Sequence, residues 1–212
     1  MNIEVVNSAL TLAVFTIAGI MDYIYREVDP ELWLIPAPIL GVLGLASIMN
    51  KPQGPWSYLY LYAMNGLMVL FVGLMYKIDL IGGADLAAVS FLAIALPAVP
   101  NSIFPSVLLS ITYSIPFVVA YLAIQLYRAC GVRCLARGRV RVKGSYLVEH
   151  LHWWIPSGSR IEGDPHEIIA RLNAWDKEIE ATPLLPLVTL LWLGLSAALL
   201  FGDGPVASLL GG

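Results

Sequence analysis

The chain has 212 residues, of which 58% are hydrophobic and 13% are charged, and its formal net charge is −3 at pH 7. Because a soluble globular domain carries about 25% charged residues, this composition excludes an ordinary soluble fold. Apolar stretches near the roughly 20 residues that cross a bilayer recur along the whole length. We therefore expect an all-α polytopic membrane protein. No cleavable signal peptide is expected, because no Lys or Arg precedes the first apolar stretch.

The hydropathy pattern predicts six transmembrane helices. The fourth is short and runs into Pro97 and Pro100, which favours a tilted or broken span. The third and fifth contain Asn65 and Gln125, polar side chains that need partners inside a helix bundle. We place the six spans near 5–25, 32–49, 57–76, 84–99, 102–127 and 183–201.

The basic residues predict the orientation of the chain. Eleven of the twelve Lys and Arg residues fall in the connections between spans 1 and 2, 3 and 4, and 5 and 6, whereas the opposite side has only Lys51. Because the positive side of a membrane protein faces the cytosol, both termini should lie outside. We expect a multi-pass protein of the plasma membrane whose large connection is cytosolic.

The large connection between spans 5 and 6 is expected to form a small cytosolic α+β segment. The chain is thus expected to comprise residues 1–127 with spans 1 to 5, a subdomain at 128–181, and the last span with its outer tail at 182–212. The stretch "RVRVKGSYLV" alternates basic and apolar residues, which is typical of a strand or hairpin arm. The stretch "GDPHEIIARLNAWDKEIEA" predicts a helix. Its signals are the capping box of Asp164 and Glu167, and an apolar stripe of Ile168, Leu172, Trp175 and Ile179.

Two aspartates fall inside or beside the apolar spans, on the same side of the membrane. Asp22 lies in "AGIMDYIYREV", near the end of the first span, and Asp85 lies in "LIGGADLAAV", at the start of the fourth. Ionisable groups in spans are costly and usually face a cavity or one another, so matched depth favours a pair. Close carboxylates share one proton, which suits general acid–base hydrolysis of an amide by water. Asp22 and Asp85 are therefore the candidate catalytic residues.

The residues before Asp85 indicate how a substrate could reach it. Gly82, Gly83 and Ala84 leave the backbone without bulk and free to adopt unusual dihedral angles. An extended substrate strand could then approach closely and bind main-chain groups. The alternative is a flexible loop in which Asp85 merely caps the next helix.

Three motifs together resemble the type IV prepilin peptidase family, and within it the archaeal preflagellin (archaellin) peptidase branch. They are "MDYIYREVDPELWLIP", the "GGAD" that matches a Gly-x-hydrophobic-Asp motif, and the proline-rich "TPLLPLVTL". The order of the motifs and the six-span topology agree over essentially the whole chain. The residues that carry the resemblance are Asp22, Arg26, Val28, Pro30, Trp33, Gly82, Ala84, Asp85, Pro183 and Pro186.

The resemblance implies an intramembrane aspartyl endopeptidase that needs no cofactor. It would remove short basic leaders, typically after a glycine, from pilin- or archaellin-like precursors at the cytosolic membrane face. Such precursors and membrane lipid are the expected partners, and nucleic acid is not. Arg26 either anchors a carboxylate or lipid phosphate near the site or simply follows the positive-inside bias. The residues that would surround the leader with negative charge, or that are merely solvated, are Glu27, Asp29, Glu31 and Asp79.

The chain also departs from the family pattern. Val28-Asp29-Pro30 stands where Ile-Pro-Asn is commoner. Bacterial members carry a four-cysteine zinc motif and also N-methylate the product, whereas this chain has only Cys130 and Cys134. We expect these two to be reduced thiols in a cytosolic linker, although His150 and His152 are near enough in sequence to act as metal ligands. Neither zinc nor methyltransferase activity is implied.

Other functional classes stay open at this level. Presenilin and signal peptide peptidase also use a Gly-x-Gly-Asp motif, but they have more spans and a Tyr-Asp pair, whereas the order here is Met21-Asp22-Tyr23. A proton- or cation-coupled transporter would use buried aspartates to bind its ion. A structural membrane subunit would tolerate replacement of both. The sequence does not identify the precursor or the oligomeric state.

Overall fold

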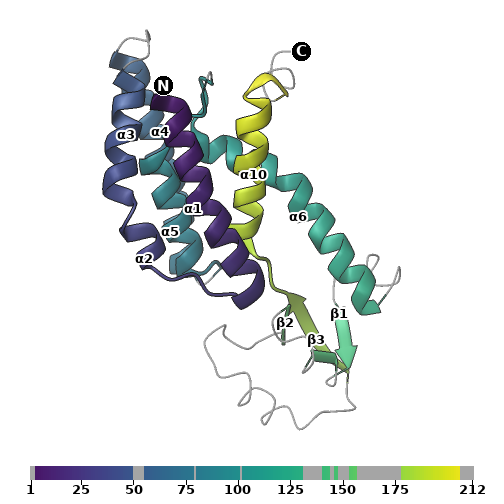
Figure 1. The fold of residues 1–212 in the computed structure, drawn as a ribbon. Coiled ribbons are helices and arrows are strands. Elements are labelled where there is room, and N and C mark those ends of the chain that lie inside the picture. The colour runs from purple at the N-terminus through teal and green to yellow at the C-terminus, as the bar shows by residue number, and fades with distance from the viewer. Residues whose placement is uncertain are drawn as a thin grey trace. The chain divides into compact units, whose positions relative to one another are not determined.

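The computed structural model describes a mostly helical chain (Figure 1). Four helices are long and apolar enough to cross a membrane: Ile3–Tyr25, Glu31–Met49, Leu59–Lys77 and Ser106–Arg128. Two shorter apolar helices, Gly83–Ala95 and Leu187–Phe201, fall where the fourth and sixth spans are expected. The described residues are 3–49, 55–78, 80–100, 102–130, 140–143, 146–147, 153–156 and 178–205.

The chain divides into two compact units. The first, called here the helical unit, comprises Met1–Phe117 and Pro186–Gly212, and the second comprises Val118–Leu185. The boundary falls inside helix α6 (Ser106–Cys130), one residue after Pro116. A proline in a helix interior removes one backbone hydrogen bond, so it is a natural point for such a division.

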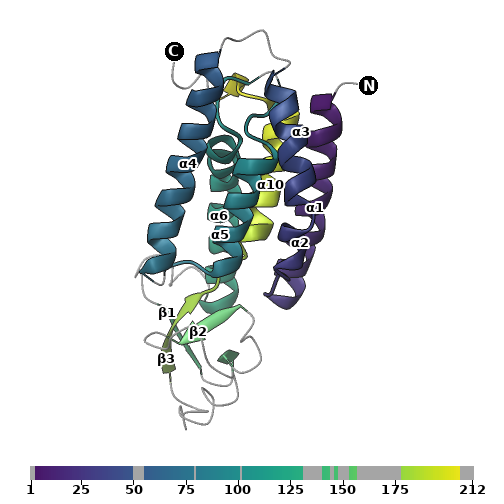
Figure 2. The ribbon, with the colours of Figure 1, turned by 90° about the vertical axis from the view of Figure 1, so that its left-hand side faces the viewer.

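In the helical unit, the first and last helices of the chain pack against each other. Helix α1 contacts α10 and α3, and both α3 and α4 pack against α5 (Figures 1 and 2). In both views the end of α1 and the starts of α5 and α10 lie toward the same end of this unit. The bounds are α1 Ile3–Tyr25, α2 Glu31–Leu34, α3 Ala37–Met49, α4 Pro55–Lys77, α5 Gly83–Ala95 and α10 Leu187–Phe201.

A buried aromatic triplet fixes α1 and α5 relative to each other. The ring of Trp33 on α2 lies 5.3 Å, centroid to centroid, from both Phe15 on α1 and Phe91 on α5. Phe15 and Phe91 are themselves 5.9 Å apart, and all three side chains are buried. Aromatic pairs at such separations contribute about 0.5–1.5 kcal/mol each beyond the burial of their area. Because α1 carries Asp22 and α5 carries Asp85, this contact helps to set the distance between the acids.

Side chains from other helices satisfy the irregular backbone that follows α5. Asn7 Nδ2 donates to the carbonyl of Ala95 over 2.6 Å, and Asn65 Nδ2 donates to that of Pro97 over 2.7 Å. The Ser106 hydroxyl donates to the Leu96 carbonyl. Non-helical backbone at membrane depth requires such partners within the protein. A short apolar helix lies where the fourth span is expected, the expected partner of Asn65 is present, and Gln125 is buried.

The second unit contains a small antiparallel sheet with strand order β1-β3-β2. Its strands are β1 (Val140–Lys143), β2 (Trp154–Pro156) and β3 (Glu178–Pro183). Ala181 in the central strand pairs with Val140 on one side and Pro156 on the other. Strand β1 confirms the expected strand in "RVRVKGSYLV".

The helix expected in this connection was predicted wrongly at its C-terminal end, which is a strand. The stretch from Glu178 to Ala181 forms part of β3, where Ile179 pairs with Val142 and Glu180 pairs with Arg141. Arg141 and Glu180 also approach to 3.8 Å as an ion pair. Pairing with two neighbouring strands outweighs the local helical periodicity of so short a segment. The remaining helix signals, Asp164, Glu167, Ile168, Leu172 and Trp175, lie outside the described residues, as do Cys134, His150 and His152.

Close packing of α10 against α6 within the helical unit depends on one glycine. A Cβ atom at Gly194 would lie 2.1 Å from the Ser110 carbonyl oxygen and 2.9 Å from the Ser114 nitrogen, both backbone atoms. Gly66, in the interior of α4, has no atom within 4 Å of such a Cβ. Both glycines are helical, so their intrinsic cost relative to alanine is comparable.

We expect Gly194→Ala to lower the thermal stability of the purified protein, because backbone atoms cannot move aside as a flexible side chain can. Gly66→Ala should leave stability unchanged or raise it by up to about 1 kcal/mol. Unfolding temperatures measured in one detergent compare the two variants. Equal stability of both variants would contradict the close approach of α6 and α10.

Candidate active site

Asp22 is buried and hydrogen-bonded across the interface between α1 and α10. Its Oδ2 accepts the backbone N–H of Thr189 (N···O 2.9 Å) and lies 3.0 Å from the Thr189 hydroxyl oxygen. The same hydroxyl donates to the carbonyl of Gly19 over 2.8 Å, one turn before Asp22. Thr189 therefore connects the start of the last helix to two points on the first.

The local sequence explains why α10 needs this contact. Pro186 occupies the N-cap position of α10 and offers no side-chain hydrogen bond. The N–H groups of the first helical turn have no acceptor within their own helix. Asp22 supplies that acceptor from α1, as an N-cap side chain would. This aspartate therefore has a structural use in addition to any chemical one.

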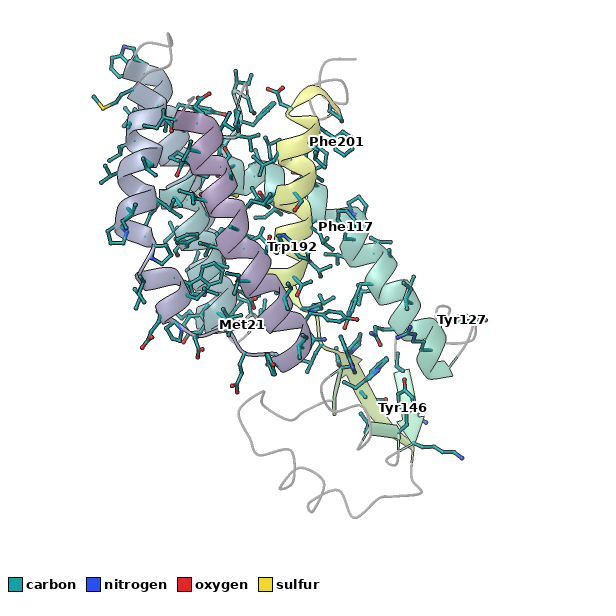
Figure 3. All side chains as sticks on the ribbon, in the orientation of Figure 1. Met21, Phe117, Tyr127, Tyr146, Trp192 and Phe201 are labelled. Carbon is teal, nitrogen blue, oxygen red and sulfur yellow. The ribbon has the colours of Figure 1, made fainter. Side chains whose placement is uncertain are left out.

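Gly19 allows the two helices to approach at this point. A Cβ at Gly19 would lie 3.0 Å from a ring carbon of Trp192, closer than most real contacts of a Cβ. In Figure 3, Met21, the residue before Asp22, lies toward the end of α1. Trp192, three residues after Thr189, lies on α10. The Trp192 ring thus packs where Gly19 leaves room for it.

Asp85 lies in the first turn of α5 and is partly buried. Its Oδ2 accepts the backbone N–H of Gly82 over 3.0 Å, so it caps its own helix. The glycine backbone differs from the expectation: Gly82 has φ −80° and ψ 162°, an extended conformation open to any residue. Gly202 is the one glycine with positive φ among the described residues.

Small size, rather than unusual dihedral angles, is what the glycines contribute. A Cβ at Gly82 would lie 3.4 Å from Asp85 Oδ2, and one at Gly83 would lie 3.7 Å from the Tyr76 ring. Both glycines are exposed, while Ala84 is partly buried. A larger side chain at Gly82 would therefore cover the carboxyl group from the open side.

Asp22, in the last turn of α1, and Asp85, in the first turn of α5, are carried toward the same end of the helical unit (Figures 1 and 2). Met21 and Ala84, which precede the acids in sequence, pack in one hydrophobic cluster. The carboxyl groups are close enough for the charge of Asp22 to act on Asp85. Asp22 and Asp85, which are 63 positions apart in sequence (85 − 22), thus lie toward one end of the helical unit. Such a pair can bind and activate a water molecule.

Arg26 lies near Asp22 in a strained turn. Arg26 directly follows Tyr25, the last residue of α1, and its φ is 61°. This left-handed backbone conformation costs a residue other than glycine about 1–2 kcal/mol. Its backbone N–H donates to the Asp22 carbonyl over 3.1 Å. Its guanidinium is near enough to attract the Asp22 carboxylate.

The other expected site residues lie as follows. Glu27, Asp29 and Glu31 are exposed in and after the turn that follows α1. Pro186 immediately precedes α10, and Pro183 is the last residue of β3 in the second unit. Asp79 lies outside the described residues. In the part of the chain that the structure describes, no three His, Cys, Asp or Glu side chains gather as a metal site.

Sequence reasoning missed Thr189 and Gly19. The signal available was modest: a hydroxyl residue in the first turn of an apolar helix, three positions after a proline. Comparisons with protein-family models, with curated proteins and with solved structures give no match to this chain. The site is therefore interpreted from its own geometry.

Asp22→Ala should destabilise the protein by about 0.5–2 kcal/mol, the usual cost of a lost N-cap side chain. Asp22→Asn should retain most of this stability, because its amide oxygen still accepts the Thr189 N–H. Thermal unfolding in detergent measures both. If Asp22→Ala is as stable as the wild type, then Asp22 does not cap α10.

Proposed function

We propose that this protein is an intramembrane aspartyl endopeptidase of the prepilin and preflagellin peptidase type. The observation that carries the proposal is that Asp22, at the end of α1, and Asp85, at the start of α5, lie toward one end of the helical unit, near enough for the charge of Asp22 to act on Asp85. Two features support it further: Asp22 is fixed by α10, and the glycines beside Asp85 leave its open side uncovered. Four helices are long and apolar enough to cross a membrane, and two shorter apolar helices lie at the positions of the expected fourth and sixth spans.

The proposed chemistry needs both carboxyl groups and no covalent intermediate. One carboxylate takes a proton from a water molecule as its oxygen adds to the peptide carbonyl carbon. The other, protonated, carboxyl donates its proton to the substrate, and the C–N bond then breaks to release a carboxylic acid and an amine. Because the pair shares one proton, its two members act as a unit rather than with permanent roles.

The surroundings of the site suit a basic leader. With the orientation proposed from the basic residues, Asp22 and Asp85 lie at the cytosolic membrane face. A precursor would keep its apolar helix in the bilayer and present its leader at that level. Glu27, Asp29 and Glu31 are exposed just after α1 and would attract such a leader electrostatically. Pilin- or archaellin-like precursors are the substrate class that this arrangement favours.

A second candidate, a structural membrane subunit, is favoured by one specific observation. Each acid has a capping role: Asp22 toward α10 and Asp85 toward Gly82. Asparagine can accept the same N–H groups but cannot act as a general acid or base. Replacement by Asn therefore separates the structural role from the catalytic one.

We expect Asp22→Asn and Asp85→Asn each to lower cleavage of a type IV prepilin-like precursor by at least about 100-fold, as for loss of a general acid or base. The assay uses purified protein in liposomes and measures release of the leader. Asp203→Asn is the matched control. Its carboxylate accepts the Ile103 N–H over 3.3 Å, beyond the end of α10 rather than at its start.

The control should cleave at the wild-type rate. Normal cleavage by folded Asp22→Asn or Asp85→Asn would contradict the protease. An unchanged rate in both would favour the structural subunit. Proton or cation flux into the same liposomes, lost in both Asn variants, would instead favour a coupled transporter.

A further inference from the structure

The Thr189 hydroxyl has two hydrogen-bonding partners but only one proton. Its oxygen lies 2.8 Å from the Gly19 carbonyl oxygen and 3.0 Å from Asp22 Oδ2. The Gly19 carbonyl is an acceptor only, and an ionised carboxylate is likewise an acceptor only. The hydroxyl therefore cannot donate fully to both at once, and the protonation state of Asp22 decides where its proton points.

When Asp22 is ionised, the hydroxyl donates to Oδ2. This choice is favoured because hydrogen bonds to an ionised acceptor are roughly twice as strong as neutral ones. The Gly19 carbonyl loses little, because a carbonyl inside an α-helix already accepts the N–H four residues later. The Thr189 backbone N–H donates to the same Oδ2. The carboxylate is thus held by two donors from one residue.

When Asp22 is protonated on Oδ2, the direction of the contact reverses. The carboxyl O–H donates to the Thr189 hydroxyl oxygen, and the hydroxyl donates to the Gly19 carbonyl. All three short contacts around Thr189 are then satisfied at the same heavy-atom positions. The two states differ only in the proton on Asp22 Oδ2 and in the direction of the Thr189 O–H bond.

We propose that Thr189 is a positioning residue whose hydroxyl rotates between Asp22 Oδ2 and the Gly19 carbonyl, holding Asp22 in place in both protonation states. Its catalytic meaning rests on the proposed function, in which Asp22 gains and loses a proton in each cycle. Thr189 itself neither gains nor loses one: the proton on Asp22 comes from water or solvent and leaves to the substrate or solvent. A fixed carboxyl group avoids reorganisation at the moment of proton transfer.

The test compares Thr189→Val, which keeps the branched shape without the hydroxyl, with Thr189→Ser, which keeps the hydroxyl. The matched control is Thr16→Val on α1, whose hydroxyl donates only to the Leu12 carbonyl one turn earlier. All are assayed for cleavage of a prepilin-like precursor in liposomes. The kcat of Thr189→Val should fall about 10- to 100-fold, the range for a lost hydrogen bond to a charged group.

In the same assay KM should change less than about twofold, because the lost bond is to Asp22 rather than to substrate. Thr189→Ser should recover most of the kcat, and Thr16→Val should match the wild type. A kcat of folded Thr189→Val equal to that of the wild type would overturn the proposal. So would an equal loss in Thr189→Ser and Thr189→Val, because packing of the methyl group would then explain both.

A second measurement does not depend on cleavage. Infrared difference spectra between high and low pH should contain a carboxylic acid C=O band that is absent from Asp22→Asn and therefore belongs to Asp22. Thr189→Val should shift this band, because the O–H of protonated Asp22 loses its acceptor. An unshifted band would overturn the proposal even if the wild type cleaves no precursor. If Thr189→Val does not fold, Thr189→Cys, a weak donor and acceptor, replaces it in both assays with the same expectation.

Discussion

The buried carboxyl group of Asp22 must find its hydrogen bonds inside the protein, and it finds them at the start of α10. In the core of a bilayer an unsatisfied polar group costs several kcal/mol, so such a group dictates which elements surround it. Here it ties the first helix of the chain to the last, across 167 positions of sequence. The close approach at Gly19 and Trp192 lies in the same interface.

The two helices that begin at the site, α5 and α10, are both short. Helix α5 has 13 residues and α10 has 15, which at 1.5 Å per residue is about 20 and 22 Å, against a hydrocarbon core of about 30 Å. Irregular backbone follows α5, and its polar groups need partners within the protein. Asn7, Asn65 and Ser106 provide them after α5.

A capping role and a catalytic role are compatible in the same acids. An acid that caps a helix is held in one orientation, which is what proton transfer requires of it. The difference between the acids is in their setting. Asp22 is buried between two helices, whereas Asp85 is held by its own helix and lies beside exposed glycines. We infer that substrate would approach from the Asp85 side.

The apolar helices could be predicted because they depend on local composition, and so could the placement of both acids at one end of these helices. Asn65 could be predicted to need a partner, since an amide in an apolar helix must be satisfied somewhere. Thr189 could not be predicted, because its role follows from a contact made only when α1 and α10 pack together. Its place three positions after Pro186 is only a weak local signal, and the hydroxyl of Thr16, which bonds to its own helix, is of the same chemical kind.

The errors have equally specific causes. Ile179 completes an apolar stripe of helical period, yet its segment is short and pairs with two strands brought to it by the fold. The glycines before Asp85 favour unusual dihedral angles by their chemistry, but Gly82 is extended. The left-handed conformation occurs instead at Arg26, a residue type that gives no hint of it. Each is a case in which tertiary structure outweighs local preference.

The central claim is that the carboxyl groups of Asp22 and Asp85 face each other, and cysteine cross-linking tests it most directly. In a background with Cys130→Ser and Cys134→Ser, the pair Asp22→Cys and Asp85→Cys is treated with mild oxidant or a short bifunctional thiol reagent. Remaining thiols are then counted by mass after maleimide labelling. The control pair places cysteine at positions 85 and 203, near opposite ends of the helical unit. We expect the first pair to cross-link within one chain and the control to keep both thiols; equal reactivity of the two pairs would contradict the account.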